Sequence, residues 1–537
     1  MNGAYDAVVI GAGFSGLYAL YKLRVLGLRT CAFEQADGVG GTWLWNRYPG
    51  ARCDLESLEY SYSFSKDIER EWVWTESMPA QAEIEAYLNF VADRLDLRRD
   101  IQFTTRVTSL TFDEVAATWS VGTDRADRYC ARFIIAATGL LSVPLDPAIS
   151  GMDDFAGRSL FSSRYPREEV DFEGKRVAVI GTGSTGVQAI PLLAQRAKHL
   201  YVFQRSAAYT APSTARPFSP GEFAALQADY PAIRAAQRMA RAGAARTSAF
   251  NVLSEAATRP SLRSASRAEQ VRAIDELGLL GALFWSDVAF DIEASITARG
   301  LYGEALARIV KDPATAAALV PEYPFGCKRP IIDQGYYETF NRDNVTLVDL
   351  RKGPIEAVTE NGIRTAQGSF EVDIIFYATG FDAMTGALTR MDIRGKGGML
   401  LRHLWQQEGP ASYLGLLVAG FPNLFLVTGP GSPGALANVA TSLEYQIDWI
   451  ADCIAHIRER GLRSIEARHD AQAAWVEHMN SLVEGSLALH PSCNSWWIGA
   501  NVPGKKRMFM SYAGGMPEYR RRCDEVAAAG HAGCAFS

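Results

Sequence analysis

Two glycine-rich turns of the same form constrain the fold of this chain more than any other feature of its sequence. Both have the spacing Gly-x-Gly-x-x-Gly and follow a short apolar run, with glycines at Gly11, Gly13 and Gly16 and again at Gly181, Gly183 and Gly186. In such a turn the first glycine allows a tight bend, the second lets the backbone approach a pyrophosphate, and the third lets a helix pack on a strand. A helix-like segment and a second apolar strand follow each turn, so the sequence predicts two dinucleotide-binding units.

The end of the second strand in each unit indicates which nucleotide it binds. Glu34 lies eighteen residues after Gly16, and the residue eighteen positions after Gly186 is Gln204, followed by Arg205 and Ser206. A carboxylate suits a free ribose 2′-hydroxyl, whereas a neutral residue with an arginine suits a 2′-phosphate. We therefore expect FAD in the first unit and NADPH in the second. The predicted fold class is α/β, with two Rossmann-like dinucleotide-binding domains and a helical insertion.

The domain boundaries are predicted from strand ends and composition. Buried strands end in Ala-Thr-Gly at residues 137–139 and 378–380, where the chain would cross between the domains, and prolines after the first crossing mark a linker. Residues 212–322 are rich in Ala, Arg, Leu and Glu with helical spacing, which predicts a mostly helical insertion that covers the active site. We expect FAD-binding segments at 1–143 and 378–537, NADPH-binding segments at 144–211 and 323–377, and solvated helix faces for the basic run 234–246.

Charge and cysteine spacing exclude several other classes of protein. The 537 residues carry a net charge of −6, and no basic stripe favours nucleic acid. The eight cysteines have neither C-x-x-C pairs nor metal-ligand spacing, so we expect scattered reduced thiols in a cytoplasmic protein and no metal site. No run of eighteen apolar residues suggests a membrane span, and the first strand begins too early for a secretory signal.

The segment after Glu34 carries a resemblance to a known family. Glycines and large aromatic residues between Gly38 and Asp54 describe an ordered loop folded against a flat partner, for which an isoalloxazine ring is the best candidate. From Gly40 to Ser65 this segment resembles the Baeyer–Villiger monooxygenases, especially the phenylacetone and cyclohexanone monooxygenase group. The resemblance extends from about residue 5 to about residue 535 and is weakest between about 207 and 320. It implies an NADPH- and FAD-dependent enzyme that inserts one oxygen atom of O2 beside a ketone carbonyl, giving an ester or lactone through a C4a-peroxyflavin.

The same resemblance implies roles for individual residues. Within Tyr323–Pro330, Lys328 would add to the 2′-phosphate pocket, and Arg329 would sit over the flavin as the catalytic cation. Asp54 would be its partner, because a buried arginine needs a carboxylate. Trp496 would belong to a mobile loop and reach the nicotinamide nucleotide. The expected cofactor contacts are Gly11, Gly13, Ser15, Gly16, Glu34, Gly41, Thr42, Trp43, Asp54, Tyr60, Val107, Val439, Thr182, Gly183, Ser184, Thr185, Gly186, Arg205, Ser206, Lys328, Arg329 and Trp496.

One part of the family's pattern is broken in this chain. The signature F-x-G-x-x-x-H-x-x-x-W has Phe161 at the histidine position and Tyr165 at the tryptophan position. Phenylalanine neither donates a hydrogen bond nor titrates, so any coupling that needs the histidine is absent or supplied otherwise. Since the other expected site residues are in place, we still expect an active monooxygenase. Its partners would be a small ketone and O2, and the protein would be a monomer or weak oligomer.

Other functions remain open at the level of sequence. A flavin monooxygenase that oxidises nitrogen or sulfur would use the protonated flavin hydroperoxide. The altered signature at Phe161 and Tyr165 is compatible with this alternative. A pyridine nucleotide–disulfide reductase shares both glycine turns but needs a cysteine pair near the flavin, and Cys53 stands alone in its loop. A flavin-binding regulatory protein, or an inactive relative, would explain Phe161 but would leave Asp54 and Arg329 without a role.

Overall fold

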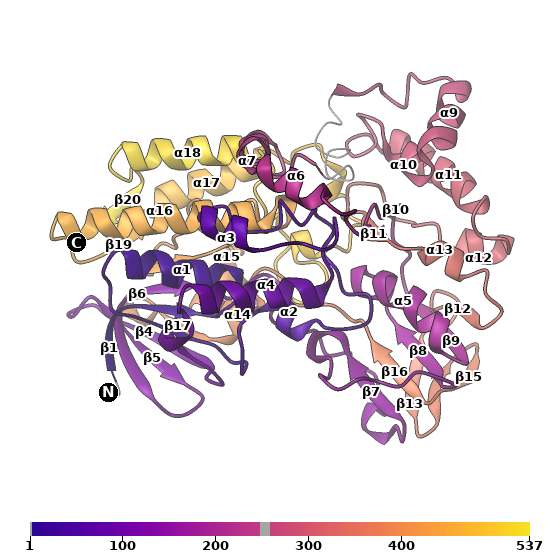
Figure 1. Cartoon of the computed structure of the whole chain (residues 1–537), viewed down its shortest axis with the longest axis horizontal. Coiled ribbons are helices and arrows are strands. Elements are labelled where there is room, and N and C mark those ends of the chain that lie inside the picture. The colour runs from indigo at the N-terminus through magenta and orange to yellow at the C-terminus, as the bar shows by residue number, and fades with distance from the viewer. Residues whose placement is uncertain (1–2, 247–257) are drawn as a thin grey trace.

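Two units built on parallel strands lie side by side in the computed structural model, which describes residues 3–246 and 258–537 (Figure 1). The larger sheet has the strand order β17-β4-β5-β6-β1-β2-β3, with β18 paired to β6. Its strands are β1 (Gly3–Ile10), β2 (Thr30–Phe33), β3 (Ile101–Gln102), β4 (Val107–Asp113), β5 (Thr118–Thr123), β6 (Arg128–Ala136), β17 (Asp392–Arg394) and β18 (Leu424–Leu426). Segments from both ends of the chain therefore build one unit.

Strand β6 is the branch point of this sheet. Its first half pairs antiparallel with β5, while its second half pairs parallel with β18 through Ile134 and Leu424. On its other edge β6 pairs in parallel with β1, so that Ile10 lies opposite Ala136. The end of β6 therefore places the Ala137–Gly139 crossing directly beside the first glycine turn.

The smaller sheet is entirely parallel, with the order β12-β9-β8-β16-β7. Its strands are β7 (Arg158–Phe161), β8 (Arg176–Ile180), β9 (His199–Gln204), β12 (Val345–Asp349) and β16 (Ile374–Tyr377). Ile180 lies opposite Tyr377, which repeats the relation between Ile10 and Ala136 in the larger sheet. Three smaller sheets complete the fold: β10 (Thr210–Pro212) with β11 (Ile331–Asp333); β13 (Ile355–Thr359), β14 (Gly362–Thr365) and β15 (Gly368–Glu371); and β19 (Ile465–Ala467) with β20 (Cys534–Phe536).

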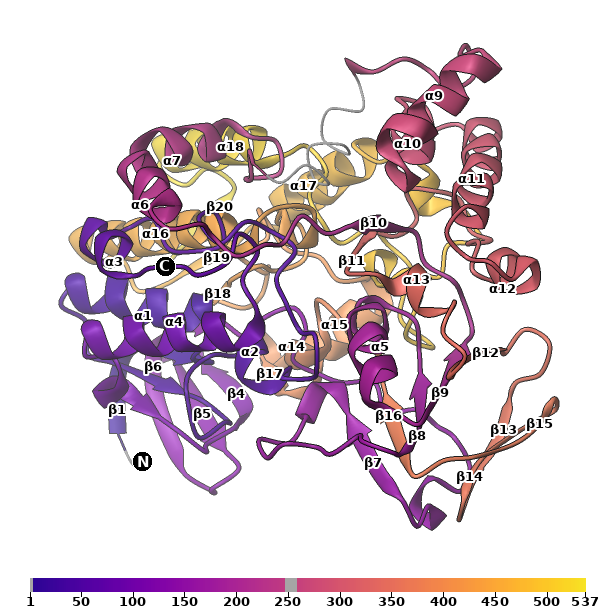
Figure 2. The same ribbon diagram turned by 45° about the vertical axis from the view of Figure 1, so that its right-hand side comes forward.

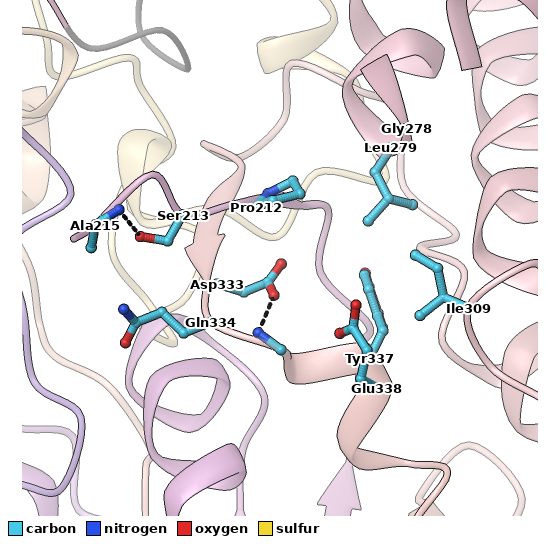
Figure 3. A pocket seen from close by; sticks show the side chains of 11 residues that line it. Pro212, Ser213, Ala215, Gly278, Leu279, Ile309, Asp333, Gln334, Tyr337 and Glu338 are labelled. Carbon is cyan, nitrogen blue, oxygen red and sulfur yellow. Dashed lines mark hydrogen bonds between the residues drawn. The ribbon is translucent and has the colours of Figure 1, made fainter. Parts of the chain in front are cut away.

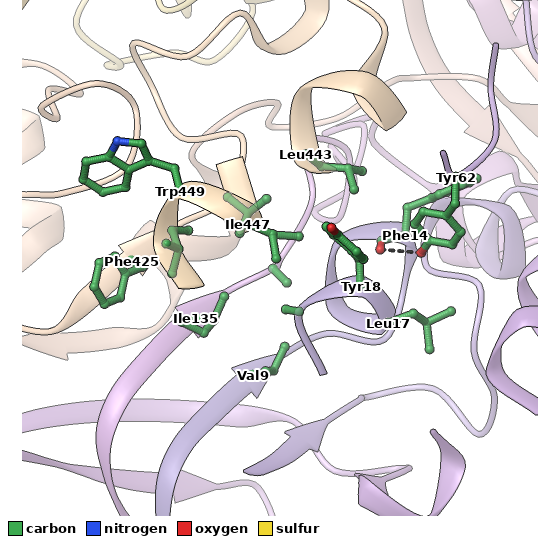
Figure 4. Close-up of a cluster of buried hydrophobic side chains, with 14 of the residues drawn as sticks. Val9, Phe14, Leu17, Tyr18, Tyr62, Ile135, Phe425, Leu443, Ile447 and Trp449 are labelled. Atoms are coloured by element: carbon green, nitrogen blue, oxygen red, sulfur yellow. Dashed lines mark hydrogen bonds between the residues drawn. The ribbon is translucent and has the colours of Figure 1, made fainter. Parts of the chain in front are cut away.

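Helices from both ends of the chain cover the larger sheet. Helix α1 (Phe14–Val25) packs against α16 (Val439–Glu459), and Val9 and Ile135 of the sheet share one core with Ile447 of α16 (Figure 4). The other helices of this unit are α2 (Thr42–Trp45), α3 (Lys66–Glu71), α4 (Gln81–Arg94), α14 (Gly386–Arg390), α15 (Leu401–Glu408), α17 (His469–Ser481) and α18 (Met516–Ala528). Helices α5 (Ser184–Arg196) and α13 (Tyr336–Thr339) belong to the smaller unit. Apolar burial on this scale is the main source of stability.

The predicted insertion is helical, and its helices form two groups. Helices α6 (Glu222–Ala228) and α7 (Tyr230–Met239) pack on the larger unit, where Phe223 and Ile233 join its core. Helices α9 (Arg267–Leu277), α10 (Leu279–Leu283), α11 (Ile292–Ala307) and α12 (Pro313–Ala318) join the core of the smaller unit (Figure 2). The insertion therefore contacts both units. The boundaries given above for the domains stay predictions.

The expectation that the basic run 234–246 forms only solvated helix faces is wrong at Arg234. This side chain is 6% exposed and forms an ion pair with Glu69 at 2.8 Å, and it also donates to Ser61 Oγ and the Tyr62 carbonyl oxygen. Arg238 is exposed on α7, as predicted, whereas Arg241 and Arg246 are exposed but lie beyond the end of this helix at Met239. The carboxylate that makes the burial of Arg234 tolerable lies 165 residues away in sequence, so local spacing gave no sign of it.

The α/β class with two Rossmann-like units is confirmed. In residues 3–246 and 258–537 no helix combines the length and apolar character needed to cross a membrane. The same residues contain no group of three His, Cys, Asp or Glu side chains placed to hold a metal ion.

Candidate nucleotide-binding and active site

Each glycine turn is shaped by the strand end beside it. Gly11 has φ +105°, and a Cβ atom there would lie 2.6 Å from the carbonyl oxygen of Ala137. Gly181 has φ +111° and faces the carbonyl oxygen of Ala378 in the same way. A side chain at Gly16 or Gly186 would collide with the carbonyl oxygen of the first glycine of its turn. The turns therefore require glycine, and the two Ala-Thr-Gly segments form one wall of each.

The helices that follow these turns have N-termini that no side chain caps. Helix α1 begins after Gly13 and α5 after Gly183, and neither receives a side-chain cap or has an acidic residue in its first turn. By contrast, α9 is closed by a capping box at Ser266. Unoccupied N–H groups at a helix N-terminus, with the positive end of the helix dipole, bind phosphate. Space for a ligand at Gly183 is open, because nothing lies within 4 Å of a Cβ atom built there.

Glu34 lies beside the first turn, at the end of β2. Its carboxylate accepts hydrogen bonds from the amides of Ala12 at 2.7 Å and Ala36 at 2.8 Å. Burial raises the pKa of Glu34 above its ordinary value. The carboxylate is therefore fixed next to the glycine turn, where an FAD ribose would lie.

The corresponding place in the second unit carries no acid. Gln204 is buried and donates to the Ala318 carbonyl oxygen at 2.8 Å, while its own Oε1 has no hydrogen-bond partner among the described residues. Thr182 Oγ1 donates to the carbonyl oxygen of Ser206 at 2.9 Å, which draws the segment after β9 towards the glycine turn. Arg205 and Ser206 are exposed there.

Lys328 and Arg205, predicted to share one pocket, lie close enough to interact. Burial and the charge of Arg205 together lower the pKa of Lys328. The Lys328 ammonium also lies 4.7 Å from the ring centre of Tyr323. Within the described part of the chain, neither cation has an acidic partner. Two neighbouring cations without a carboxylate suit a strongly charged anion.

Arg329 and Asp54 form the predicted ion pair, and the two residues come from different units. Asp54 ends the loop that follows β2 and α2, whereas Arg329 lies two residues before β11. Each side chain is 29% exposed. Burial lowers the pKa of the Arg329 guanidinium to about 10, so it stays charged at neutral pH and needs the carboxylate to offset desolvation.

The glycine- and aromatic-rich loop lies between the two units. At its start, Trp43 Nε1 donates to Tyr60 Oη at 3.0 Å, and a Cβ atom at Gly13 would lie 3.2 Å from the Cα of Gly41. Further on, Tyr48 Oη donates to Gln188 Oε1 of α5 at 2.8 Å. The loop thus touches both the first glycine turn and the smaller unit. The contact with Gln188 could not be predicted from spacing, because the loop and α5 are distant along the chain.

The other predicted contact residues lie at the ends of elements. Ser15 lies in the first turn of α1, and Thr42 starts α2. Ser184 and Thr185 start α5, Val107 starts β4, where it is buried, and Val439 starts α16 behind the cap residue Asn438. Their contacts with a cofactor stay predictions.

Trp496 lies in a short 3-10 helix, Trp496–Ile498, and is partly buried. It packs against the small cluster of Ala383, Met384 and Met510. Two polar contacts hold the same segment to the chain just after Ala378–Gly380. Asn501 Nδ2 donates to the Phe381 carbonyl oxygen at 2.9 Å, and Lys505 pairs with Asp382 at 2.8 Å. The second nucleotide crossing and the Trp496 segment are therefore in contact.

The expectation that all cysteines are reduced thiols is wrong for two of the eight. Cys327 and Cys493 form a disulfide, with their Cα atoms 5.4 Å apart and a sequence separation of 166. The other cysteines are Cys31, Cys53, Cys130, Cys453, Cys523 and Cys534, and they are free. A pair so far apart has no spacing motif, and only the three-dimensional contact between the segments shows it.

Phe161, in the histidine position of the broken signature, makes an aromatic contact in place of a polar one. Its ring stacks on Tyr377 with centres 4.7 Å apart and an angle of 14°, and the Arg164 guanidinium lies 4.3 Å from its centre. Tyr377 ends β16 directly before Ala378. Tyr165 contacts Phe376 edge to face. Aromatic and cation–π packing therefore holds this crossing together.

A separate cavity of about 370 Å³ lies between the insertion and the smaller unit, lined in part by Pro212, Leu279, Ile309 and Asp333 (Figure 3). Asp333 accepts hydrogen bonds from the amides of Gly335 and Tyr336 at 3.1 Å, which starts α13. None of the residues predicted to bind a cofactor lines this cavity. It is therefore distinct from the two glycine turns.

The chain is similar to several known proteins. A model of the flavin-binding monooxygenase-like family matches residues 4–216. Cyclohexanone 1,2-monooxygenase of Acinetobacter sp is 42% identical over 96% of this chain and 94% of its own length. Phenazine N-monooxygenase PhzNO1 of Lysobacter antibioticus is 38% identical over 98% and 96%. The solved structure of an oxidised steroid monooxygenase bound to NADP is 46% identical, with a TM-score of 0.90 over 99% of both chains.

Proposed function

Because this chain belongs to the Baeyer–Villiger monooxygenases and uses NADPH, FAD and O2, we propose that its substrate is a small ketone and that Arg329 is its catalytic cation. The observation that carries the proposal is the Arg329–Asp54 ion pair. One partner follows the FAD-binding turn and the other lies beside the NADPH-binding unit. A fixed guanidinium at this junction is suited to stabilise negative charge that develops on oxygen.

The described residues fit both nucleotides. The uncapped starts of α1 and α5 suit two pyrophosphates, and Glu34 suits the ribose of FAD. Arg205 and Lys328 suit the 2′-phosphate of NADPH. When bound, the pair of cofactors supplies hydride transfer and activation of O2. The protein supplies the binding, the orientation and the charge.

Asp54 would orient the Arg329 guanidinium through their ion pair. A guanidinium that is 29% exposed would otherwise point freely towards water, and the carboxylate fixes its direction. The pair also offsets the cost of burying a charge. Arg329 would then donate to an oxygen atom of the reacting ketone as that atom gains negative charge. Trp496 would close the nucleotide site from water, as the resemblance implies.

The pH dependence of NADPH binding tests the role of Lys328. Its pKa is lowered by burial and by Arg205, so the ammonium loses its charge at a lower pH than an ordinary lysine does. The KM for NADPH should therefore rise as the pH increases into the alkaline range. Lys328→Arg should remove this rise, because arginine keeps its charge. KM for NADPH and NADH would be measured across pH; an identical alkaline profile in both proteins would exclude Lys328 as the titrating group.

Product analysis tests the proposed reaction. The protein would be given NADPH, 18O2 and either a cyclic ketone or a thioether, with products identified by mass spectrometry. We expect a lactone with one labelled oxygen atom. The similarity to a phenazine N-monooxygenase and the replacement of the signature histidine by Phe161 support a second candidate, oxidation of nitrogen or sulfur. An N-oxide or sulfoxide without any lactone would favour that candidate. Cytoplasmic location and a monomeric or weakly oligomeric state stay predictions.

A further inference from the structure

The Cys327–Cys493 disulfide joins the two segments that carry the predicted nicotinamide-side residues. Cys327 immediately precedes Lys328 and Arg329, and Cys493 lies three residues before Trp496. A three-residue chain spans at most about 11 Å. The bond therefore ties the indole and the two cations to anchor points whose Cα atoms are 5.4 Å apart. That separation is typical of natural disulfides.

Buried contacts keep both anchor points in place. Cys327 is 0% and Cys493 1% exposed. The carbonyl oxygen of Leu487 lies 3.6 Å from the sulfur of Cys327 and 3.0 Å from that of Cys493, and the Leu487 amide donates to Ala289. A Cβ atom built on Gly326 would lie 3.1 Å from the Cβ atom of the same Ala289, so the Cys327 segment passes close to Ala289. The bond is thus buried where the Lys328 segment meets the Trp496 segment.

The other end of the Trp496 segment is attached elsewhere. Asn501 and Lys505 bind Phe381 and Asp382, which follow the second crossing. Arg507 Nη2 returns to the Cys493 carbonyl oxygen at 2.9 Å. Without the disulfide, these contacts would still hold the segment to the crossing. They would not fix its distance from Lys328 and Arg329, which lie on a different segment.

We infer that the Cys327–Cys493 disulfide is a positioning element for nicotinamide-nucleotide binding, which holds the Trp496 segment against the Lys328–Arg329 segment. This inference rests on the proposed function, since it assumes that both segments line the nucleotide site. Loss of the bond should weaken the retention of NADP+. A larger share of the NADPH should then be oxidised by O2 to give hydrogen peroxide instead of oxygenated product. Hydride transfer at saturating NADPH should change little, because the glycine turns and Arg205 are untouched.

A double-mutant cycle tests the inference on the full-length holoenzyme. Cys327→Ser, Cys493→Ser and the double variant would be compared in the dissociation constant of NADP+, KM and kcat for NADPH, and product formed per NADPH. We expect each to raise the dissociation constant and KM about tenfold, within the range that misplacement of a site produces, with kcat for flavin reduction nearly unchanged. Because either substitution breaks the same bond, the double variant should match the single variants.

Controls separate positioning from general damage. Cys453→Ala removes a buried free thiol on α16 and should leave all four readouts unchanged. If the serine variants do not fold, Cys327→Ala with Cys493→Val fills the same space with apolar atoms. Alkylation of the unfolded, unreduced wild type should modify six cysteines, namely those that are free.

Three results would overturn the inference: eight alkylated thiols, additive effects of the two serine substitutions, or unchanged NADP+ binding in the double variant. None of them depends on the oxygenation reaction, because NADP+ binding and alkylation are measured without turnover. Failure of the proposed function would instead appear as absence of labelled lactone from the wild type.

Discussion

Replacement of Arg329 by alanine is expected to stop most oxygen insertion while NADPH is still consumed. The guanidinium is the cation that Asp54 holds at the junction of the two units. Loss of one preorganised donor of this kind costs about a hundredfold to a thousandfold in rate. FAD should remain bound, because Arg329 lies outside the glycine turn that would hold its pyrophosphate. Labelled lactone, hydrogen peroxide and NADPH oxidation would be measured together.

Arg52 provides a matched control for this variant. It lies two residues before Asp54, is 17% exposed and forms an ion pair with Glu76 at 2.6 Å. Arg52→Ala removes a half-buried arginine from the same loop but should keep lactone formation within a few-fold of the wild type. Arg329→Lys keeps the charge without the planar fork and should recover only part of the rate. Normal lactone formation by Arg329→Ala would remove Arg329 from the catalytic role.

Features that depend on local spacing were predictable from the sequence. The register that places Glu34 and Gln204 at equivalent strand ends follows from counting residues, because a strand, a turn and a helix have nearly fixed lengths. Both positions lie at their strand ends in the structure. The ion pair of Arg329 with Asp54 was also expected, although only the resemblance pointed to it and not any spacing in the chain.

Features that depend on distant contacts were not predictable. From the sequence alone, Arg234 is predicted to lie on a solvated helix face, because its partner Glu69 comes close only in the folded chain. Cys327 and Cys493 read as isolated thiols because the segments that carry them meet only in the folded chain. Phe161 reads as a lost histidine, yet its ring has a partner in Tyr377 because β7 and β16 are neighbouring strands. In each case the side chain that it contacts lies far away in the sequence, so spacing along the chain could not identify it.

Removal of both Arg205 and Lys328 is expected to abolish the preference for NADPH over NADH. A hydrogen bond to a charged group contributes about 1.5–3 kcal/mol, so two of them correspond to a loss of about a hundredfold to ten-thousandfold in kcat/KM for NADPH. The value for NADH should change by less than about threefold, because NADH has no 2′-phosphate for these cations to bind. The two cations lie close enough for Arg205 to lower the pKa of Lys328, so this sum is an upper limit and the loss in the double variant should be smaller than the two single losses added together. Each single variant and the double variant would be measured with both nucleotides.

Arg196→Ala, which removes a partly exposed arginine at the far end of α5, serves as the control and should keep the preference for NADPH. An equal loss with NADPH and NADH would show that these side chains support the fold of the second unit and do not recognise the phosphate.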